Sequence, residues 1–137
     1  MNLVRDAMVP DPPTLDVSAS AQEAGAHLEE PTVRAVLVCE DGRLAGVITR
    51  KTLVREVVAA GRDPRTTKLG TIAERPLFTL DGGTPLDVAF RELEDRDLER
   101  VPVTEEGRLV GVLSRTAVQR RLFEDEPPAE SDEAGSY

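Results

Sequence analysis

The chain has 137 residues, of which 39% are hydrophobic and 3% aromatic, and it carries 26 acidic against 17 basic side chains, for a formal net charge of −9. This charge repels nucleic acid and anionic membrane surfaces, and no apolar run approaches the roughly 20 residues that a membrane-spanning helix needs. The single cysteine, Cys39, excludes an internal disulfide and favours a reducing compartment, by default the cytoplasm.

In chain order, the first half predicts a short helix, a strand, a helix, a hairpin and a second helix. A capping box at Ser20 and Glu23 begins the first long helix, and Asp41-Gly42 provides the hairpin turn. The expected elements are a helix or turn over 3–8, an extended segment over 14–17, a helix over 20–29, strands over 34–39 and 44–48, and a helix from 49 to about 60 that ends at Gly61.

The second half repeats this order. Thr84 as N-cap, Pro85 at the first helical position and Asp87 in the first turn predict the start of its first long helix. The other expected elements are a turn or short helix over 69–74, an extended run over 75–79, strands over 101–104 and 109–113, and a helix from 114 to about 123.

The two halves are copies of one unit. Gly46 and Gly111 are 65 residues apart, and at this offset several pairs are identical: Gly42/Gly107, Arg43/Arg108, Leu44/Leu109, Val47/Val112, Arg50/Arg115 and Arg55/Arg120. We therefore expect repeats over residues 1–64 and 65–123, followed by an acidic disordered tail over 124–137. Because 60-residue units bury little surface alone, we expect the repeats to share one core.

Each repeat has a strand that ends at a helix start. Thr49 and Ser114 are the expected N-caps, and Arg50 and Arg115 follow them. Backbone N–H groups and a positive charge at such a junction suit a phosphate. The hydroxyls are equally expected as caps without any ligand, and a glycine such as Gly46 before a buried run more often marks a bulge or tight packing.

The order strand, helix, strand, strand, helix, with Gly-hydrophobic-hydrophobic-Thr/Ser at each junction, resembles a tandem pair of CBS (cystathionine-β-synthase-type) domains. The resemblance covers about Leu3 to Phe123. It implies an α+β fold in which two β-α-β-β-α repeats pack as one pseudo-twofold module. It also implies a regulatory protein that is not an enzyme, forms a homodimer, binds an adenosyl ligand (AMP, ADP, ATP or S-adenosylmethionine) and acts on a partner in trans.

The resemblance also implies the site residues. Phosphate would contact Thr49, Arg50, Ser114 and Arg115, and the base and ribose would lie around Thr14, Ala35, Val36 and Thr52 in the first repeat and Phe78, Arg100, Val101 and Pro102 in the second. In the family, an aspartate three residues after the Thr or Ser accepts from the ribose hydroxyls, but here those positions are Thr52 and Ala117. The alternative function is therefore a ligand-free dimerisation or protein-interaction module.

No motif in the sequence predicts a catalytic or metal site. His27 has no ligand partner at metal spacing, and Cys39 lacks a catalytic partner. A third, weaker hypothesis is nucleic-acid binding through Arg62, Arg65 and Lys68, which the net charge opposes. We expect no enzymatic activity, no metal and no resident cofactor beyond a bound adenosyl nucleotide.

Overall fold

The computed structural model describes residues 2–75 and 78–124. The predicted disordered tail lies outside these residues apart from Glu124, and so do two positions of the predicted extended run over 75–79. The fold is α+β, as predicted, and the described chain divides into two compact units. We call residues 13–75 the first-repeat unit and residues 2–12 with 78–124 the second-repeat unit.

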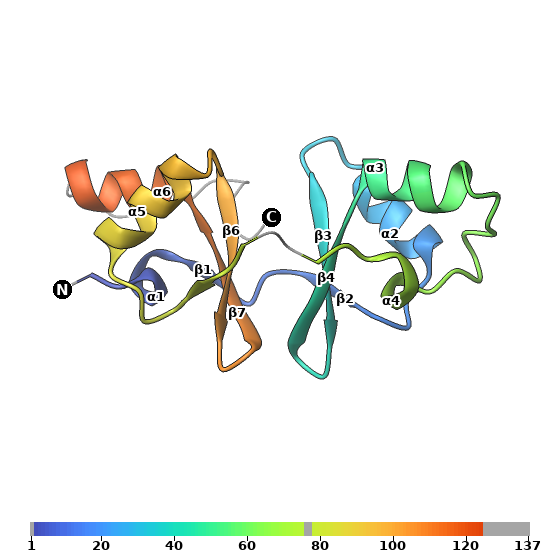
Figure 1. The fold of residues 1–137 in the computed structure, drawn as a ribbon, viewed down its shortest axis with the longest axis horizontal. Helices are drawn as coiled ribbons and strands as arrows, with labels where there is room; N and C mark the ends of the chain where they lie inside the picture. The colour runs from blue at the N-terminus through green and yellow to red at the C-terminus, as the bar shows by residue number, and fades with distance from the viewer. Residues whose placement is uncertain (1, 76–77, 125–137) are drawn as a thin grey trace. The chain divides into compact units, whose positions relative to one another are not determined.

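The first-repeat unit contains a sheet in the order β2-β3-β4 (Figure 1). Strand β2 runs parallel to β3, and β3 is antiparallel to β4. Its elements are β2 (Thr14–Asp16), α2 (Ala21–Leu28), β3 (Ala35–Glu40), β4 (Arg43–Thr49), α3 (Arg50–Leu53), the π-helical segment η1 (Val54–Val58) and α4 (Leu69–Ile72). The predicted helices and hairpin are therefore present.

The second-repeat unit has a sheet in the order β5-β6-β7-β1. Strand β5 is parallel to β6, and the other two pairings are antiparallel. Its elements are α1 (Val4–Ala7), β1 (Val9–Pro10), β5 (Leu80–Asp81), α5 (Leu86–Asp95), β6 (Arg100–Glu105), β7 (Arg108–Ser114), α6 (Arg115–Gln119) and the π-helical segment η2 (Arg120–Glu124). Helices α5 and α6 pack against each other within this unit (Figure 1).

Both hairpin turns require left-handed backbone. Asp41 and Gly42 have φ of 52° and 80°, and Glu106 and Gly107 have φ of 54° and 83°. Positive φ at both central residues is the geometry of a type I′ turn, whose twist matches that of the paired strands. The acidic-Gly pairs thus specify both hairpins, as the sequence predicted.

Helix α5 begins one residue later than the sequence predicted. Its N-cap is Pro85, with ψ of 141°, and Leu86 is its first residue. The N-terminal segment explains the shift, because Val4 donates its backbone N–H to the carbonyl of Thr84 at 2.8 Å and Leu86 donates to the carbonyl of Asn2 at 3.1 Å. These two bonds flank Pro85 and hold it in an extended conformation against Leu3.

The two repeats exchange their first segments. Residues 2–12, at the start of the first repeat, pack in the second-repeat unit, and residues 65–75, at the start of the second repeat, pack in the first-repeat unit. Strand β1 pairs with β7, with Val9 opposite Val112. At the equivalent place in the first-repeat unit, Glu74, which follows α4, forms a bridge with Val47 of β4. We call residues 2–12 and 65–75 the crossing segments, because each leaves its own sequence repeat to pack on the other repeat's hairpin.

Gly46 and Gly111 lie where the crossing segments touch the sheets. A Cβ at Gly46 would lie 2.7 Å from the Cβ of Ala73, and a Cβ at Gly111 would lie 2.8 Å from the carbonyl oxygen of Val9. The strand register also shifts beside each glycine. The interpretation of these glycines as sites of tight packing and a bulge is therefore confirmed.

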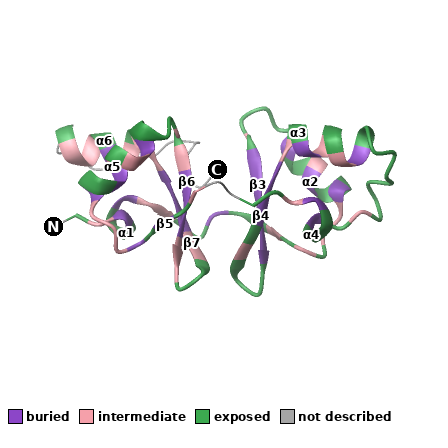
Figure 2. Ribbon diagram, in the orientation of Figure 1, coloured by how far each residue is buried: buried purple, intermediate pink, exposed green. Residues whose placement is uncertain are grey.

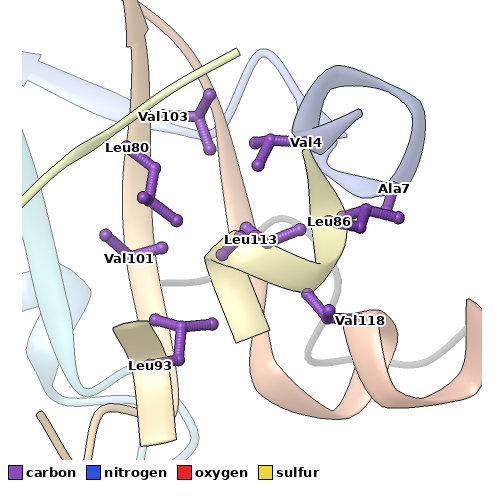
Figure 3. Close-up of a cluster of buried hydrophobic side chains, with 10 residues drawn as sticks. Val4, Ala7, Leu80, Leu86, Leu93, Val101, Val103, Leu113 and Val118 are labelled. Carbon is purple, nitrogen blue, oxygen red and sulfur yellow. The ribbon is translucent and has the colours of Figure 1, made fainter. Parts of the chain in front are cut away.

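Each unit contains a cluster of buried hydrophobic side chains. Figure 2 shows buried residues along the strands and on the helix faces that cover them. Figure 3 shows the core of the second-repeat unit, in which Val4 and Ala7 of the crossing segment join residues of α5, β6, β7 and α6. The crossing segments enlarge both cores, because Leu69 and Ile72 make the same contribution in the first-repeat unit. A core shared between the two repeats stays a prediction.

Candidate functional site

The predicted site residues divide between the two units. Those of the first repeat all lie in the first-repeat unit, and those of the second repeat all lie in the second-repeat unit. We call the residues around Thr49 the first junction and those around Ser114 the second junction, since in each a strand of the hairpin ends where a helix begins.

At the first junction, Thr49 and Thr52 form a closed hydrogen-bonded pair. The Thr49 hydroxyl accepts from the backbone N–H of Thr52 at 3.2 Å, and the Thr49 backbone N–H donates to Oγ1 of Thr52 at 3.1 Å. The two hydroxyl oxygens are 3.0 Å apart, and Thr52 has no exposed surface. Thr49 is thus an N-cap as predicted, and the Thr52 hydroxyl contributes to the cap.

Arg50 stabilises the end of another helix. Its guanidinium donates to the backbone carbonyl of Leu28, the last residue of α2, and to the carbonyl of Glu30 at 2.9 Å. The last carbonyls of a helix have no partner within the helix, so a cation there is favourable. No local pattern in the sequence indicates this contact, because Arg50 lies 22 positions after Leu28 and 20 after Glu30.

The other first-repeat residues predicted at the site lie on β2 and β3. Thr14 is exposed and is aligned with Leu37 in the parallel pair, while Ala35 is aligned with Thr49. Val36 belongs to the core of the first-repeat unit. The Val36 side chain packs in this core, so a ligand could contact this residue mainly through its backbone groups.

At the second junction, Ser114 caps α6. Its Oγ accepts from the backbone N–H of Ala117 at 3.1 Å. Ala117 lies three residues after the cap, where Thr52 lies in the first repeat, and it has no side-chain acceptor. This junction therefore offers a ribose no side-chain acceptor at position 117.

Arg115 is held by two carboxylates that the sequence analysis did not assign to the site. Its guanidinium lies 3.4 Å from Glu99 and 3.8 Å from Asp97. The Glu99 carboxylate also accepts from the hydroxyl of Thr116 at 2.9 Å, and the Glu99 carbonyl accepts from the backbone N–H of Arg115 at 2.8 Å. The sequence signal for this contact was the position of Glu99 immediately before Arg100, the residue of β6 that is aligned with Ser114.

Among the remaining second-repeat residues, Phe78 has a cation over its aromatic ring. The guanidinium carbon of Arg96 lies 3.9 Å from the centre of the Phe78 ring, and Arg96 also donates to Glu92 at 3.0 Å. Val101 is a core residue, and Pro102 is buried beside it. Arg100 begins β6 opposite Ser114. One face of the predicted base-contact ring is therefore already covered by Arg96.

Two further features lie apart from the junctions. Burial raises the pKa of the Cys39 thiol, and the nearby Asp16 carboxylate raises it further, so this cysteine is a poor nucleophile. A pocket of about 440 Å³ in the second-repeat unit is lined by residues of the chain start, α5 and η2, and none of the predicted site residues lines it. None of the helices in the described part of the chain combines the length and apolar character needed to cross a bilayer.

The duplicated β-α-β-β-α unit and its two capped junctions define a class of regulatory module. The CBS domain family model matches residues 4–59 and 69–124, and the chain belongs to this family as a tandem CBS pair. Hypoxic response protein 1 of Mycobacterium tuberculosis is 29% identical over 125 residues, which cover 90% of this chain and 87% of that protein.

Two solved structures have a similar fold. A crystal structure of Hypoxic Response Protein I with two coordinated zinc ions has a TM-score of 0.74 and 28% identity, and covers 89% of this chain and 100% of that one. A crystal structure of CBSX2 in complex with AMP has a TM-score of 0.71 and 24% identity, and the match covers 91% of this chain and 98% of that one. Within residues 2–75 and 78–124 of the present chain, no three His, Cys, Asp or Glu side chains are grouped so that they could hold a metal ion.

Proposed function

We propose that this CBS pair is a non-catalytic sensor that binds a phosphate-bearing adenosyl ligand and acts on a protein partner in trans. The observation that carries the proposal is the repeated junction, in which a hydroxyl N-cap is followed by an arginine at Thr49-Arg50 and again at Ser114-Arg115. The similarity to CBSX2, which was solved with AMP, supports the ligand class.

The geometry favours recognition of the ligand through its phosphates. Thr52 is buried and bonded to Thr49, and Ala117 has no acceptor, so neither replaces a carboxylate that would bind both ribose hydroxyls. Loss of such a charge-assisted acceptor weakens binding by about one to two orders of magnitude. We therefore expect weak affinity for adenosine and stronger affinity for nucleotides with more phosphates.

Regulation follows from a shift between conformations. A ligand changes the population of a conformation only by binding it better than the alternative. Phosphate contact with Arg50 competes with the carbonyls that this side chain caps, so binding alters the end of α2 and the surface that follows it. A partner that recognises this surface then responds to the ligand.

The second candidate is a ligand-free module for dimerisation or protein docking. It is favoured by apolar side chains on the last helical segment of each repeat, where Val58 and Phe123 occupy equivalent positions and are 73% and 65% exposed. Within the first-repeat unit, Val54 and Val58 of η1 are both exposed, and neighbouring exposed apolar side chains mark interaction sites. This candidate requires no occupied junction and is compatible with the expected homodimer.

The deciding experiment is a thermal-unfolding panel with AMP, ADP, ATP, S-adenosylmethionine, NADH and inorganic phosphate. At about 100 times its Kd, a ligand stabilises the folded state by roughly 2.7 kcal/mol, which raises the Tm of a chain of this size by about 5–15 °C. We expect a rise with an adenosyl nucleotide and loss of that rise in the double variant Arg50→Gln/Arg115→Gln.

Arg91→Gln is the matched control, because Arg91 is exposed and makes only a 4.0 Å ion pair with Asp87. It should keep the ligand-dependent rise in full. An undiminished rise in the double variant would reject the assignment of the two arginines. No rise in the parent with any of the compounds would reject sensing and leave the interaction module.

A further inference from the structure

The two junctions differ in charge at equivalent positions. At the repeat offset of 65 residues, Arg34 corresponds to Glu99, and Lys51 corresponds to Thr116. Arg50 corresponds to Arg115 and is the one cation that both junctions share. Arg100 corresponds to Ala35. The first junction therefore has three basic residues and no acidic one, and the second has two basic residues, Arg100 and Arg115, beside the acidic Glu99.

At the second junction, Glu99 neutralises the shared arginine. Its carboxylate accepts from Thr116 at 2.9 Å and lies 3.4 Å from the Arg115 guanidinium, whose side chain is 29% exposed. A phosphate that approached Arg115 would have to displace Glu99 and would meet Asp97 at 3.8 Å from the same guanidinium. Like charges at this spacing oppose each other by an amount that burial increases.

At the first junction, no carboxylate takes that position. Ala35 is aligned with Thr49 in the antiparallel pair, so the next residues outward, Arg34 and Arg50, lie at the same end of the two strands. Arg50 donates to backbone carbonyls, which leave its charge uncompensated. Throughout residues 2–75 and 78–124, none of the ion pairs involves Arg34, Arg50 or Lys51.

We propose that the two junctions have diverged: the first, with Arg34, Arg50 and Lys51, takes the anionic end of a phosphate-bearing ligand, and Glu99 closes the second to phosphate. This inference rests on the proposed function for the identity of the whole ligand, but its anion chemistry is independent of adenosine. The chain then binds one phosphate-bearing ligand, and Glu99 is the residue that excludes the second.

The test uses pyrophosphate and backbone amide NMR of the full chain, which reports where an anion binds. In the parent, pyrophosphate should shift the amides of residues 49–52 and leave those of 114–117 unchanged. In Glu99→Gln, which keeps an acceptor for Thr116 and removes the charge, the amides of 114–117 should also titrate, with an affinity at least about tenfold above the parent.

Two variants complete the design. Glu94→Gln is the control for Glu99→Gln. It removes the same charge from an exposed residue of the same unit, and Glu94 forms no ion pair with Arg115. It should leave the amides of 114–117 silent. Arg34→Glu, which gives the first junction the acid found at the second, should abolish the shifts at 49–52, and Arg91→Glu should not.

The outcomes separate this inference from the proposed function. Pyrophosphate shifts confined to 49–52, together with no response to any adenosyl compound, would reject adenosyl sensing and retain the divergence of the junctions. Shifts at 114–117 in the parent, no shifts at 49–52, or silence at 114–117 in Glu99→Gln would each overturn the divergence. Unfolding curves of all variants confirm that the chain is folded in each titration.

Discussion

At the scale of single residues, two glycines set how closely the crossing segments approach the sheets. A Cβ at Gly46 would meet the Cβ of Ala73 at 2.7 Å and the carbonyl oxygen of Glu74 at 3.0 Å. At Gly111 it would meet the sulfur of Met8 at 2.5 Å and the carbonyl oxygen of Val9 at 2.8 Å. Met8 can turn aside, but the backbone atoms cannot move without displacing the segment.

We therefore expect Gly46→Ala and Gly111→Ala each to lower the free energy of unfolding by about 1–3 kcal/mol, the usual cost of overpacking. Urea denaturation measures this change. Gly25→Ala is the control, because its new methyl group would meet only Leu53, at 3.8 Å, and alanine is the better helix former. Wild-type stability in both sheet variants would contradict the close approach.

At the scale of elements, α1 is too short to be stable alone and depends on its packing. It spans only Val4–Ala7, yet Val4 has no exposed surface and joins the core of the second-repeat unit (Figure 3). A helix of one turn gains little from its own hydrogen bonds. Its position therefore comes from the buried valine and from the backbone bonds to Thr84 and Gly82.

Val4→Ala should consequently destabilise the protein by about 1–3 kcal/mol, since it removes two buried methyl groups and leaves a cavity. The matched control is Val88→Ala in α5, where the valine is 42% exposed, and we expect a change within about 0.5 kcal/mol there. Guanidinium titration of both variants gives the comparison. Equal costs would show that the α1 valine contributes no more than an exposed one.

At the scale of the whole molecule, the compact units and the sequence repeats have different boundaries. Residues 13–75 are continuous in sequence and contain a complete core, including Leu69 and Ile72 of the crossing segment. The predicted repeat over 1–64 lacks that segment and carries residues 2–12, which belong to the other unit. The boundaries at residues 64 and 65 describe where the sequence repeats, and as domain boundaries they stay a prediction.

A fragment of residues 13–75 should accordingly fold by itself, and a fragment of residues 1–64 should not. Loss of Leu69 and Ile72, which are 0% and 4% exposed, removes two side chains that are each worth about 2–5 kcal/mol in a core. Circular dichroism and the cooperativity of thermal unfolding distinguish the two fragments. Cooperative unfolding of residues 1–64 alone would show that the crossing segment is dispensable.

The sequence by itself determined the local structure. The acidic-Gly turns, the capping residues Ser20, Thr49 and Ser114, and the apolar periodicity of the helices act over a few positions, so they can be read along the chain. The 65-residue repeat also determined the family. These signals predicted the hairpins, most helix limits and the hydroxyl-Arg junctions.

Only the tertiary structure decided which groups at the junctions are free. Thr52 is bonded to the cap residue Thr49, Arg50 donates to carbonyls at the end of α2 without an ion pair among the described residues, and Arg115 is paired with Glu99 and Asp97. The start of α5 was likewise decided by bonds from residues about 80 positions earlier. Such contacts depend on how distant segments pack, and hydrogen bonds and ion pairs over that range leave no periodic pattern in a sequence.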